Sequence, residues 1–124
     1  VSVNLAEKIL KEKKIIGITC HNSKKLATKA NIKRINYIAF GAFYPSKTKK
    51  VHYKAKLSLL NWAQKNINKP IVAIGGINQK NFKKILKAGA NYIACSASVW
   101  KSEFGDPLTA VNMFKKRYTY TKLI

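Results

Sequence analysis

Residues 70–94 read PIVAIGGINQKNFKKILKAGANYIA, and this stretch carries a complete strand–helix–strand unit. The apolar run Pro70–Gly76 predicts a buried strand, and Asn91–Trp100 predicts a second one. Between them, Gln79–Ala88 has the spacing of a helix with one apolar side, and Gly89 follows it at a position that favours glycine. Two strands that are joined through a helix run parallel, so the stretch predicts a parallel α/β fold.

The same alternation of strands and helices continues on both sides of this unit. Ile15–His21 and Asn36–Tyr44 are almost continuously apolar, which is typical of strands covered on both faces. The other helical patterns cover Leu5–Lys13, Ser23–Asn31, Ala55–Asn66 and Pro107–Tyr118. We therefore expect about four parallel βα units, half the number in a (β/α)8 TIM barrel. On pattern alone, an open sheet is the alternative.

Length and composition predict one globular domain. The chain has 124 residues, of which 47% are hydrophobic, so residues 1–124 are long enough for one core and too short for two domains. Only four residues are acidic, and this excludes a hydrolase with paired carboxylates or a metal cage built from carboxylates alone. No apolar run reaches the roughly 18 residues of a membrane span.

The two cysteines, Cys20 and Cys95, are far apart and show no zinc-ligand spacing. Both lie inside apolar runs, where a free thiol behaves as a small hydrophobic group. We therefore expect both in the core of a protein that is located in the reducing cytoplasm.

The net charge of +21 comes from 25 Lys and Arg residues. A basic surface is compatible with nucleic-acid binding. However, 23 of these residues are lysines, whereas specific phosphate and base contacts favour arginine. The lysines also scatter over the predicted solvent faces of helices. We therefore expect no specific nucleic-acid partner and no membrane partner.

Candidate functional residues follow three of the predicted strands. Ser46, Thr48 and Lys49 follow the second strand and offer two hydroxyls and a cation. Gly75-Gly76 ends the third strand, where the backbone can approach an anion closely. The small residues Cys95–Ser98 lie at the end of the fourth strand and offer further backbone N–H groups. The carboxyl ends of parallel strands meet at one edge of the sheet, which is the ligand-binding edge. The loops after the third and fourth strands therefore predict a phosphate site.

Each of these features also has a plain structural interpretation. Two glycines after a strand commonly form only a tight turn, and a basic loop is commonly just solvated. His21, at the end of the first strand, is compatible both with general acid–base catalysis and with a structural hydrogen bond. We expect Trp62 and Trp100 to be packing anchors. The prediction of a site therefore depends on the combination of features.

Four motifs in this chain occur in the order and spacing of a known family. They are GITCH at 17–21, YIAFGAFYPSKTK at 37–49, PIVAIGGI at 70–77 and AGANYIA at 88–94. The family patterns are GxSxH, GADYxxxGPxxPTxTK, PxxAIGGI and AGADGxAxxSAI. Over about residues 14–100, the chain resembles the C-terminal half of the thiamine-phosphate synthase and TenI family. The P-S/T-x-T-K loop together with AIGGI is the specific part of this resemblance.

The resemblance implies a (β/α)8 barrel and a transferase. The family joins hydroxymethylpyrimidine pyrophosphate to thiazole phosphate, forms thiamine phosphate and releases pyrophosphate. By position, Lys49 and Thr19 match the catalytic contacts with the pyrophosphate. The matching substrate-binding residues are Ser46 and Thr48, which line the site, and Gly76, Ser96 and Ala97, which bind the thiazole phosphate.

The chain departs from the family pattern at several positions. Thr19 and Ala97 each stand where the family usually has serine, and Ala42 replaces proline. Backbone N–H groups survive such changes, so we expect the phosphate site to survive them too. The resemblance implies Mg²⁺ in the intact enzyme, but the family's metal-binding acids lie on the first four strands, and no metal ligand is assigned in this chain. Because those strands have no counterpart after Val1, we expect a fragment of a longer protein.

The sequence leaves alternatives to the synthase open. A TenI-type relative would act on thiazole phosphate alone, as a tautomerase, or would have a regulatory role. The lysine of the S/T-x-T-K loop favours the synthase over such a relative. A non-catalytic phosphate-binding half-barrel that pairs with itself is a third possibility. The expected partners are small phosphate and pyrophosphate substrates, with homo-oligomers also compatible with the sequence.

Overall fold

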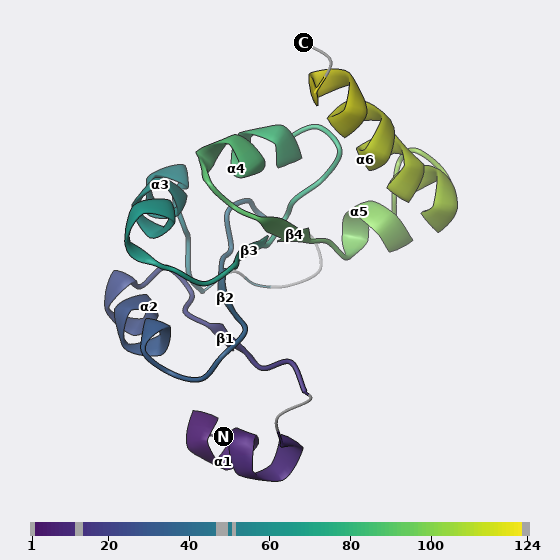
Figure 1. Cartoon of the computed structure of the whole chain (residues 1–124). Coiled ribbons are helices and arrows are strands. Elements are labelled where there is room, and N and C mark those ends of the chain that lie inside the picture. The colour runs from purple at the N-terminus through teal and green to yellow at the C-terminus, as the bar shows by residue number, and fades with distance from the viewer. Residues whose placement is uncertain (1, 12–13, 47–49, 51, 123–124) are drawn as a thin grey trace.

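The computed structural model describes residues 2–11, 14–46, 50 and 52–122, and its centre is a parallel sheet (Figure 1). The four strands lie in chain order and are β1 (Gly17–Thr19), β2 (Tyr37–Phe40), β3 (Ile71–Ile74) and β4 (Tyr92–Ala94). Each neighbouring pair is parallel. The expected α/β fold with four parallel βα units is therefore confirmed.

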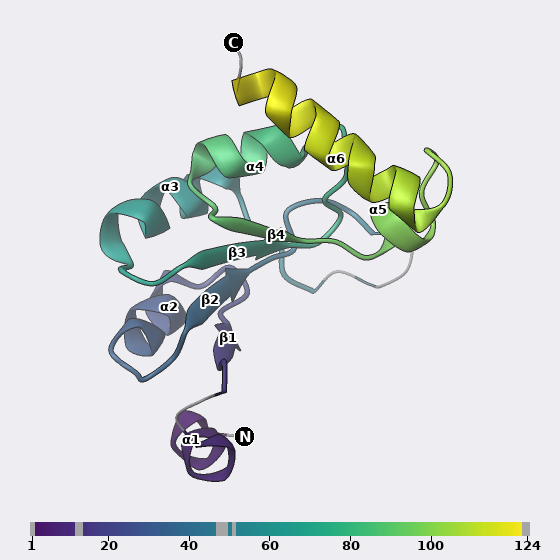
Figure 2. The ribbon, with the colours of Figure 1, turned by 45° about the vertical axis from the view of Figure 1, so that its right-hand side comes forward.

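The helices lie mainly along one face of this sheet. They are α1 (Val3–Leu10), α2 (Lys24–Asn31), α3 (Leu57–Asn66), α4 (Phe82–Ala88), α5 (Ala97–Trp100) and α6 (Pro107–Lys122). Figure 2 shows α2, α3 and α4 side by side against the strands, with α6 against α4 and α1 apart from this layer, beyond β1. Within the described residues, none of the helices combines the length and hydrophobicity that a bilayer crossing requires.

The register of the strands separates two faces of the sheet. One row of aligned residues is buried or half-buried against the helices and consists of Ile18, Ile38 and Ile71. Side chains alternate along a strand, so the next aligned row points to the opposite face. That row consists of Thr19, Ala39, Val72 and Tyr92. Thr19 and Tyr92 are exposed, whereas Ala39 is buried, so in the described chain this second face is open to solvent at its two outer strands.

Short polar and glycine signals define the ends of the helices. The Ser23 hydroxyl accepts the Leu26 N–H at 3.1 Å and caps α2. Gly89 ends α4 with a φ of +128°. The Asp106 carboxylate accepts the Thr109 N–H at 2.8 Å at the start of α6. This backbone hydrogen bond lowers the pKa of Asp106 below its ordinary value, so Asp106 acts as a helix cap.

The predicted strand Asn91–Trp100 is too long, because its last four residues form α5. Ser96 O accepts the N–H groups of Val99 at 3.0 Å and Trp100 at 2.9 Å. The strand ends at Ala94, which is aligned with Ile74, the last residue of β3. Beyond Ile74, Gly75 and Gly76 turn away from the extended conformation with positive φ values. Trp100 is 73% exposed, so its expected role as a packing anchor is wrong.

Helices α4 and α6 also differ from the sequence expectation. Helix α4 begins at Phe82 and not near Gln79. Helix α6 extends to Lys122, four residues beyond the predicted end at Tyr118. Its residues Val111 and Tyr118 are 37% and 46% exposed. Phe114 does contact the core, with its ring edge-on to that of Phe82 at 5.2 Å. Helix α6 thus packs through Phe114 and the fully buried Ala110.

Truncation of Leu60 is expected to lower the free energy of unfolding by about 2–5 kcal/mol, because Leu60→Ala leaves a cavity in the core. Leu60 is fully buried under the sheet. Leu108→Ala is the matched control, since Leu108 is 71% exposed and its truncation is expected to cost less than about 0.5 kcal/mol. Urea unfolding of both variants measures the difference, and equal losses would contradict this placement of the core.

Candidate phosphate-binding site

The glycine turn after β3 is in contact with the loop after β2. Gly75 and Gly76 have φ values of +102° and +64°, a backbone that favours glycine. The Tyr44 N–H donates to Gly75 O at 3.1 Å. A methyl group on Gly76 would lie 2.7 Å from atoms of Tyr44 and Pro45, and one on Gly75 would lie 2.3 Å from Cβ of Ala42. Both glycines are therefore required for this close approach.

Two backbone hydrogen bonds join the two ends of the loop after β2, and we call the bonded residues Ala42, Tyr53 and Ala55 the stem of this loop. The Ala42 N–H donates to Tyr53 O at 3.0 Å, and the Ala55 N–H donates to Ala42 O at 2.8 Å. Ser46 is half-buried and directly follows Pro45, which approaches Gly76. The structure thus brings Ser46 towards the glycine turn.

Thr48 and Lys49 lie outside the described residues. Their predicted roles in substrate binding and catalysis remain predictions.

Two asparagines fix the backbone after the glycine turn. Asn78 Oδ1 accepts the N–H groups of Lys80 at 2.8 Å and Asn81 at 3.1 Å. In return, Asn81 Oδ1 accepts the Asn78 N–H at 2.9 Å. The Asn81 side-chain amide also donates to Gly76 O at 3.1 Å. The segment from Gly76 to Asn81 is therefore a closed turn with a defined shape.

The turn after β4 leaves the same edge of the sheet, beside the glycine turn. Ile74 is aligned with Ala94, and Gly76 and Ser96 each lie two residues beyond this pair. Ser96 and Ala97 are exposed at the start of α5, and no side chain caps this helix. The first N–H groups of a helix have no acceptor within the helix. The predicted phosphate ligands Gly76, Ser96 and Ala97 are thus on neighbouring turns.

Thr19 is the exposed last residue of β1, on the open face of the sheet. The Cys20 N–H donates to Ala39 O at 2.8 Å, and the Gly41 N–H donates to His21 O at 3.0 Å. These bonds hold the end of β1 beside the loop after β2. Thr19 therefore belongs to the same edge as Gly76, separated from it by β2.

The His21 ring stacks on Tyr53 with 4.3 Å between ring centroids. This contact ties the end of β1 to the stem of the loop after β2, because Tyr53 O accepts the Ala42 N–H. His21 therefore has a structural contact at this edge, and its role in acid–base chemistry remains a prediction.

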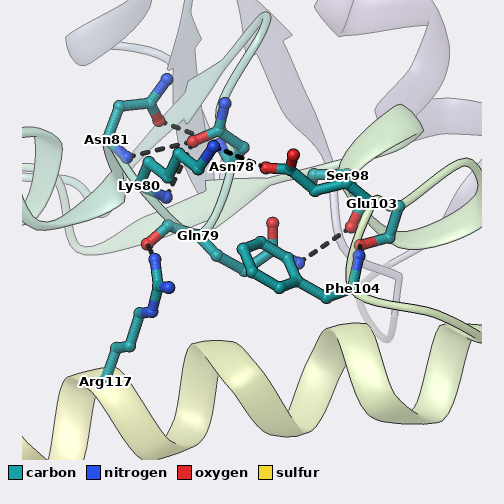
Figure 3. Close-up of polar contacts among 9 residues, drawn as sticks. Asn78, Gln79, Lys80, Asn81, Ser98, Glu103, Phe104 and Arg117 are labelled. Carbon is teal, nitrogen blue, oxygen red and sulfur yellow. Dashed lines mark hydrogen bonds and ion pairs between the residues drawn. The ribbon is translucent and has the colours of Figure 1, made fainter.

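Gln79 is a functional candidate that sequence reasoning missed. Its side chain is 3% exposed and donates to Ser98 O at 2.9 Å and to Ala110 O at 3.1 Å. Its own carbonyl accepts Arg117 Nη1 at 2.8 Å (Figure 3). Nothing in the sequence distinguishes Gln79 from the exposed polar residues around it, because its burial depends on α6, which lies about 30 residues further along the chain.

Two surface hollows lie beside the first turn of α3. One has a volume of about 440 Å³ and is lined by Phe43, Tyr44, Ala55, Lys56, Leu57 and Lys84. The other has a volume of about 240 Å³ and is lined by Asn22, Lys24, Lys54, Lys56, Ser58 and Leu59. Neither of these two hollows is lined by the predicted ligands Thr19, Gly76, Ser96 and Ala97.

The acidic side chains at this end of the molecule have other partners. Glu103 forms an ion pair with Lys80 at 2.8 Å, and Asp106 caps α6. Within the described ranges, no three His, Cys, Asp or Glu residues gather where they could hold a metal ion. These residues therefore do not fit a Mg²⁺ site.

Burial raises the pKa of both thiols. Cys20 is fully buried in the core, as expected, and Cys95 is half-buried against it. A thiol with a raised pKa remains protonated and is a poor nucleophile. Neither cysteine is therefore suited to covalent catalysis.

A solved structure contains the same arrangement of sheet and helices. Thiamine phosphate pyrophosphorylase from Pyrococcus furiosus superposes with a TM-score of 0.79 and 27% sequence identity. The match covers 97% of this chain and 55% of that chain. The sheet and its helices thus have the TIM-barrel-like fold that the sequence predicts.

Sequence comparisons agree with this structural match. Thiamine-phosphate synthase from Pelagibacter ubique is 50% identical over 110 residues, which are 89% of this chain and 53% of the relative. The enzyme of the same name from Nitrosomonas eutropha is 40% identical over 117 residues, 94% of this chain and 54% of the relative. The chain therefore spans about half the length of the curated relatives it matches. The family model described as thiamine monophosphate synthase matches residues 1–99, and the chain belongs to this family.

Proposed function

We propose that the protein is a thiamine-phosphate synthase, which condenses hydroxymethylpyrimidine pyrophosphate with thiazole phosphate and releases pyrophosphate. The observation that carries this proposal is the contact between the loop after β2 and the glycine turn. Tyr44 N–H donates to Gly75 O at 3.1 Å, so the loop bearing the P-S-K-T-K motif and the turn bearing Gly76 leave the sheet together. Such an arrangement suits a reaction with one phosphorylated substrate at each loop.

The reaction requires two anion sites with different tasks. The phosphate of the thiazole substrate is not broken, and the backbone N–H groups of Gly76, Ser96 and Ala97 would hold it in place. The pyrophosphate departs and gains charge in the transition state. Lys49 and Thr19, with Ser46 and Thr48 lining the site, would stabilise that developing charge. These donors act most strongly on the leaving group, so they would accelerate the chemical step.

We also propose a requirement for Mg²⁺ in the intact enzyme, as the family resemblance implies. When bound, Mg²⁺ would neutralise charge on the pyrophosphate. The acidic residues described in this chain do not supply its ligands, so the proposed role of this chain's own residues is to bind and orient the two substrates. The two free thiols suit a reducing compartment, and we propose a cytoplasmic location.

Steady-state assay of the full-length protein tests this function. With both substrates and Mg²⁺, we expect formation of thiamine phosphate and pyrophosphate in equal amounts. A TenI-type relative would instead act on thiazole phosphate alone, and a non-catalytic half-barrel would bind phosphate without turnover. Either of these two results would contradict the proposed function.

A further inference from the structure

The fold buries the polar side chain of Gln79, in the turn between β3 and α4. Only 3% of it is exposed, and its single amide nitrogen donates to two carbonyls from two different helices. Ser98 O of α5 lies at 2.9 Å, and Ala110 O of α6 lies at 3.1 Å. One side chain thus joins the glycine turn, the start of α5 and the first turns of α6.

Hydrogen bonds among Asn78, Asn81 and Gly76 hold the backbone on both sides of Gln79 close to Gly76. The Asn81 amide donates to Gly76 O at 3.1 Å, and Asn78 and Asn81 close the turn on either side of Gln79. The position of the Gln79 side chain is therefore fixed relative to Gly76. On the other side, the Ser98 carbonyl that Gln79 contacts lies one residue after Ala97.

We infer that Gln79 is a positioning residue that holds the start of α5 at a fixed place beside the glycine turn. The N–H group of Gly76 and those of Ser96 and Ala97 can then bind the same phosphate. This inference rests on the proposed function of Gly76, Ser96 and Ala97. The short helix α5 has four residues and cannot fix its own position through internal hydrogen bonds. It needs an external anchor, and Gln79 supplies one from the turn that carries the other half of the site.

The chemistry of the site suits a glutamine. Both contacts are to carbonyl oxygens, so the side chain must provide two N–H groups from one atom. Methionine has a similar length but no donor. A glutamate would present carboxylate oxygens to the carbonyls, and asparagine is one methylene shorter.

The Arg117 side chain braces the same residue from outside. Its Nη1 donates to Gln79 O at 2.8 Å, and its guanidinium lies 5.1 Å from the centre of the Phe104 ring (Figure 3). The ion pair between Lys80 and Glu103 also crosses from this turn, but both side chains are 63% exposed. Exposed ion pairs contribute little. The anchor therefore depends on Gln79 and Arg117 more than on Lys80.

The test is Gln79→Met in the full-length protein, with separate measurement of kcat and of KM for each substrate. We expect KM for thiazole phosphate to rise about 10-fold, because lost anchoring lets the two sets of N–H groups separate. Both kcat and KM for the pyrimidine pyrophosphate are expected to change less than about 2-fold, since they depend on the loop after β2. The matched control is Gln64→Met, which makes the same change at an exposed position of α3 and is expected to alter neither constant.

A purely structural role for Gln79 would lower stability and the yield of active protein but leave the KM for thiazole phosphate unchanged, and this result would overturn the inference. Arg117→Met is the second variant, to be used if Gln79→Met does not fold. It keeps the Gln79 side chain and removes the hydrogen bond from Arg117 to Gln79 O. For this second variant we expect a smaller rise in the same KM, about 3-fold, and an unchanged KM would overturn the inference. If the unmodified protein shows no turnover, the proposed function fails and the inference with it. If it is active while both variants keep the original KM, only the inference fails.

Discussion

Replacement of Gly76 by alanine is expected to reduce turnover about 100-fold and to lower the free energy of unfolding by about 1–3 kcal/mol. The new methyl group would lie 2.7 Å from Tyr44 O and Pro45 O, and the φ of +64° disfavours any residue with a Cβ. The loop after β2 must then move away from the glycine turn. The two anion sites would separate, so activity should fall more than the loss of folded protein explains.

Gly105→Ala is the control for backbone strain. Gly105 has a φ of +113°, but a methyl group there would meet Thr109 only at 3.7 Å, an ordinary contact. This variant is expected to lose stability without losing turnover per folded molecule. Turnover and urea unfolding, measured side by side, separate the two effects. If Gly76→Ala and Gly105→Ala had the same turnover, the contact between the two loops would have no part in catalysis.

Removal of the Lys49 side chain is expected to lower kcat by about 100-fold or more, the usual effect of losing one donor to a developing negative charge. Lys49→Ala removes the cation that we assign to the departing pyrophosphate. The KM for thiazole phosphate should change little, because that substrate binds at Gly76, Ser96 and Ala97. Steady-state kinetics with each substrate varied in turn gives both constants.

Lys50→Ala is the matched control for Lys49, since it removes the same charge from the next residue. Its effect on kcat is expected to stay within about 3-fold, which is the scale of a surface charge in a strongly basic protein. If both variants lost activity equally, the loop would act only through its general positive charge. If neither lost activity, the catalytic role assigned to Lys49 would be wrong.

The sequence predicts the sheet well because each strand is a short apolar run between clear breaks. Ile38 and Ile71 lie side by side in the core, as continuous apolar strands of a parallel sheet should. Strand lengths are predicted less well, because pairing ends where a neighbour ends. Ala97–Trp100 has the composition of a strand, but pairing with β3 ends at Ile74 and Ala94, and these four residues form α5.

The candidate site is predictable from sequence where backbone constraints act locally. The Gly75-Gly76 pair directly after an apolar run predicts a turn that comes close to other groups. In the structure, Gly76 has the close contact and the positive φ that this pattern implies. Gln79 cannot be found in this way, because its role depends on carbonyl groups of Ser98 and Ala110, which are distant in sequence. The prediction for Trp100 is wrong for a related reason. Large aromatic residues are expected to pack, but nothing in the described chain covers the exposed side of α5 at this residue, which is 73% exposed.

The central claim is that the turns after β3 and β4 form one phosphate site, and amide NMR of the labelled full-length protein tests it most directly. Titration with thiazole phosphate is expected to shift the N–H signals of Gly76, Ser96 and Ala97 together, with one dissociation constant. The N–H of Gly89, at the far end of α4, should not move. Shifts confined to one of the two turns, or no shifts at all at saturating thiazole phosphate, would contradict the account.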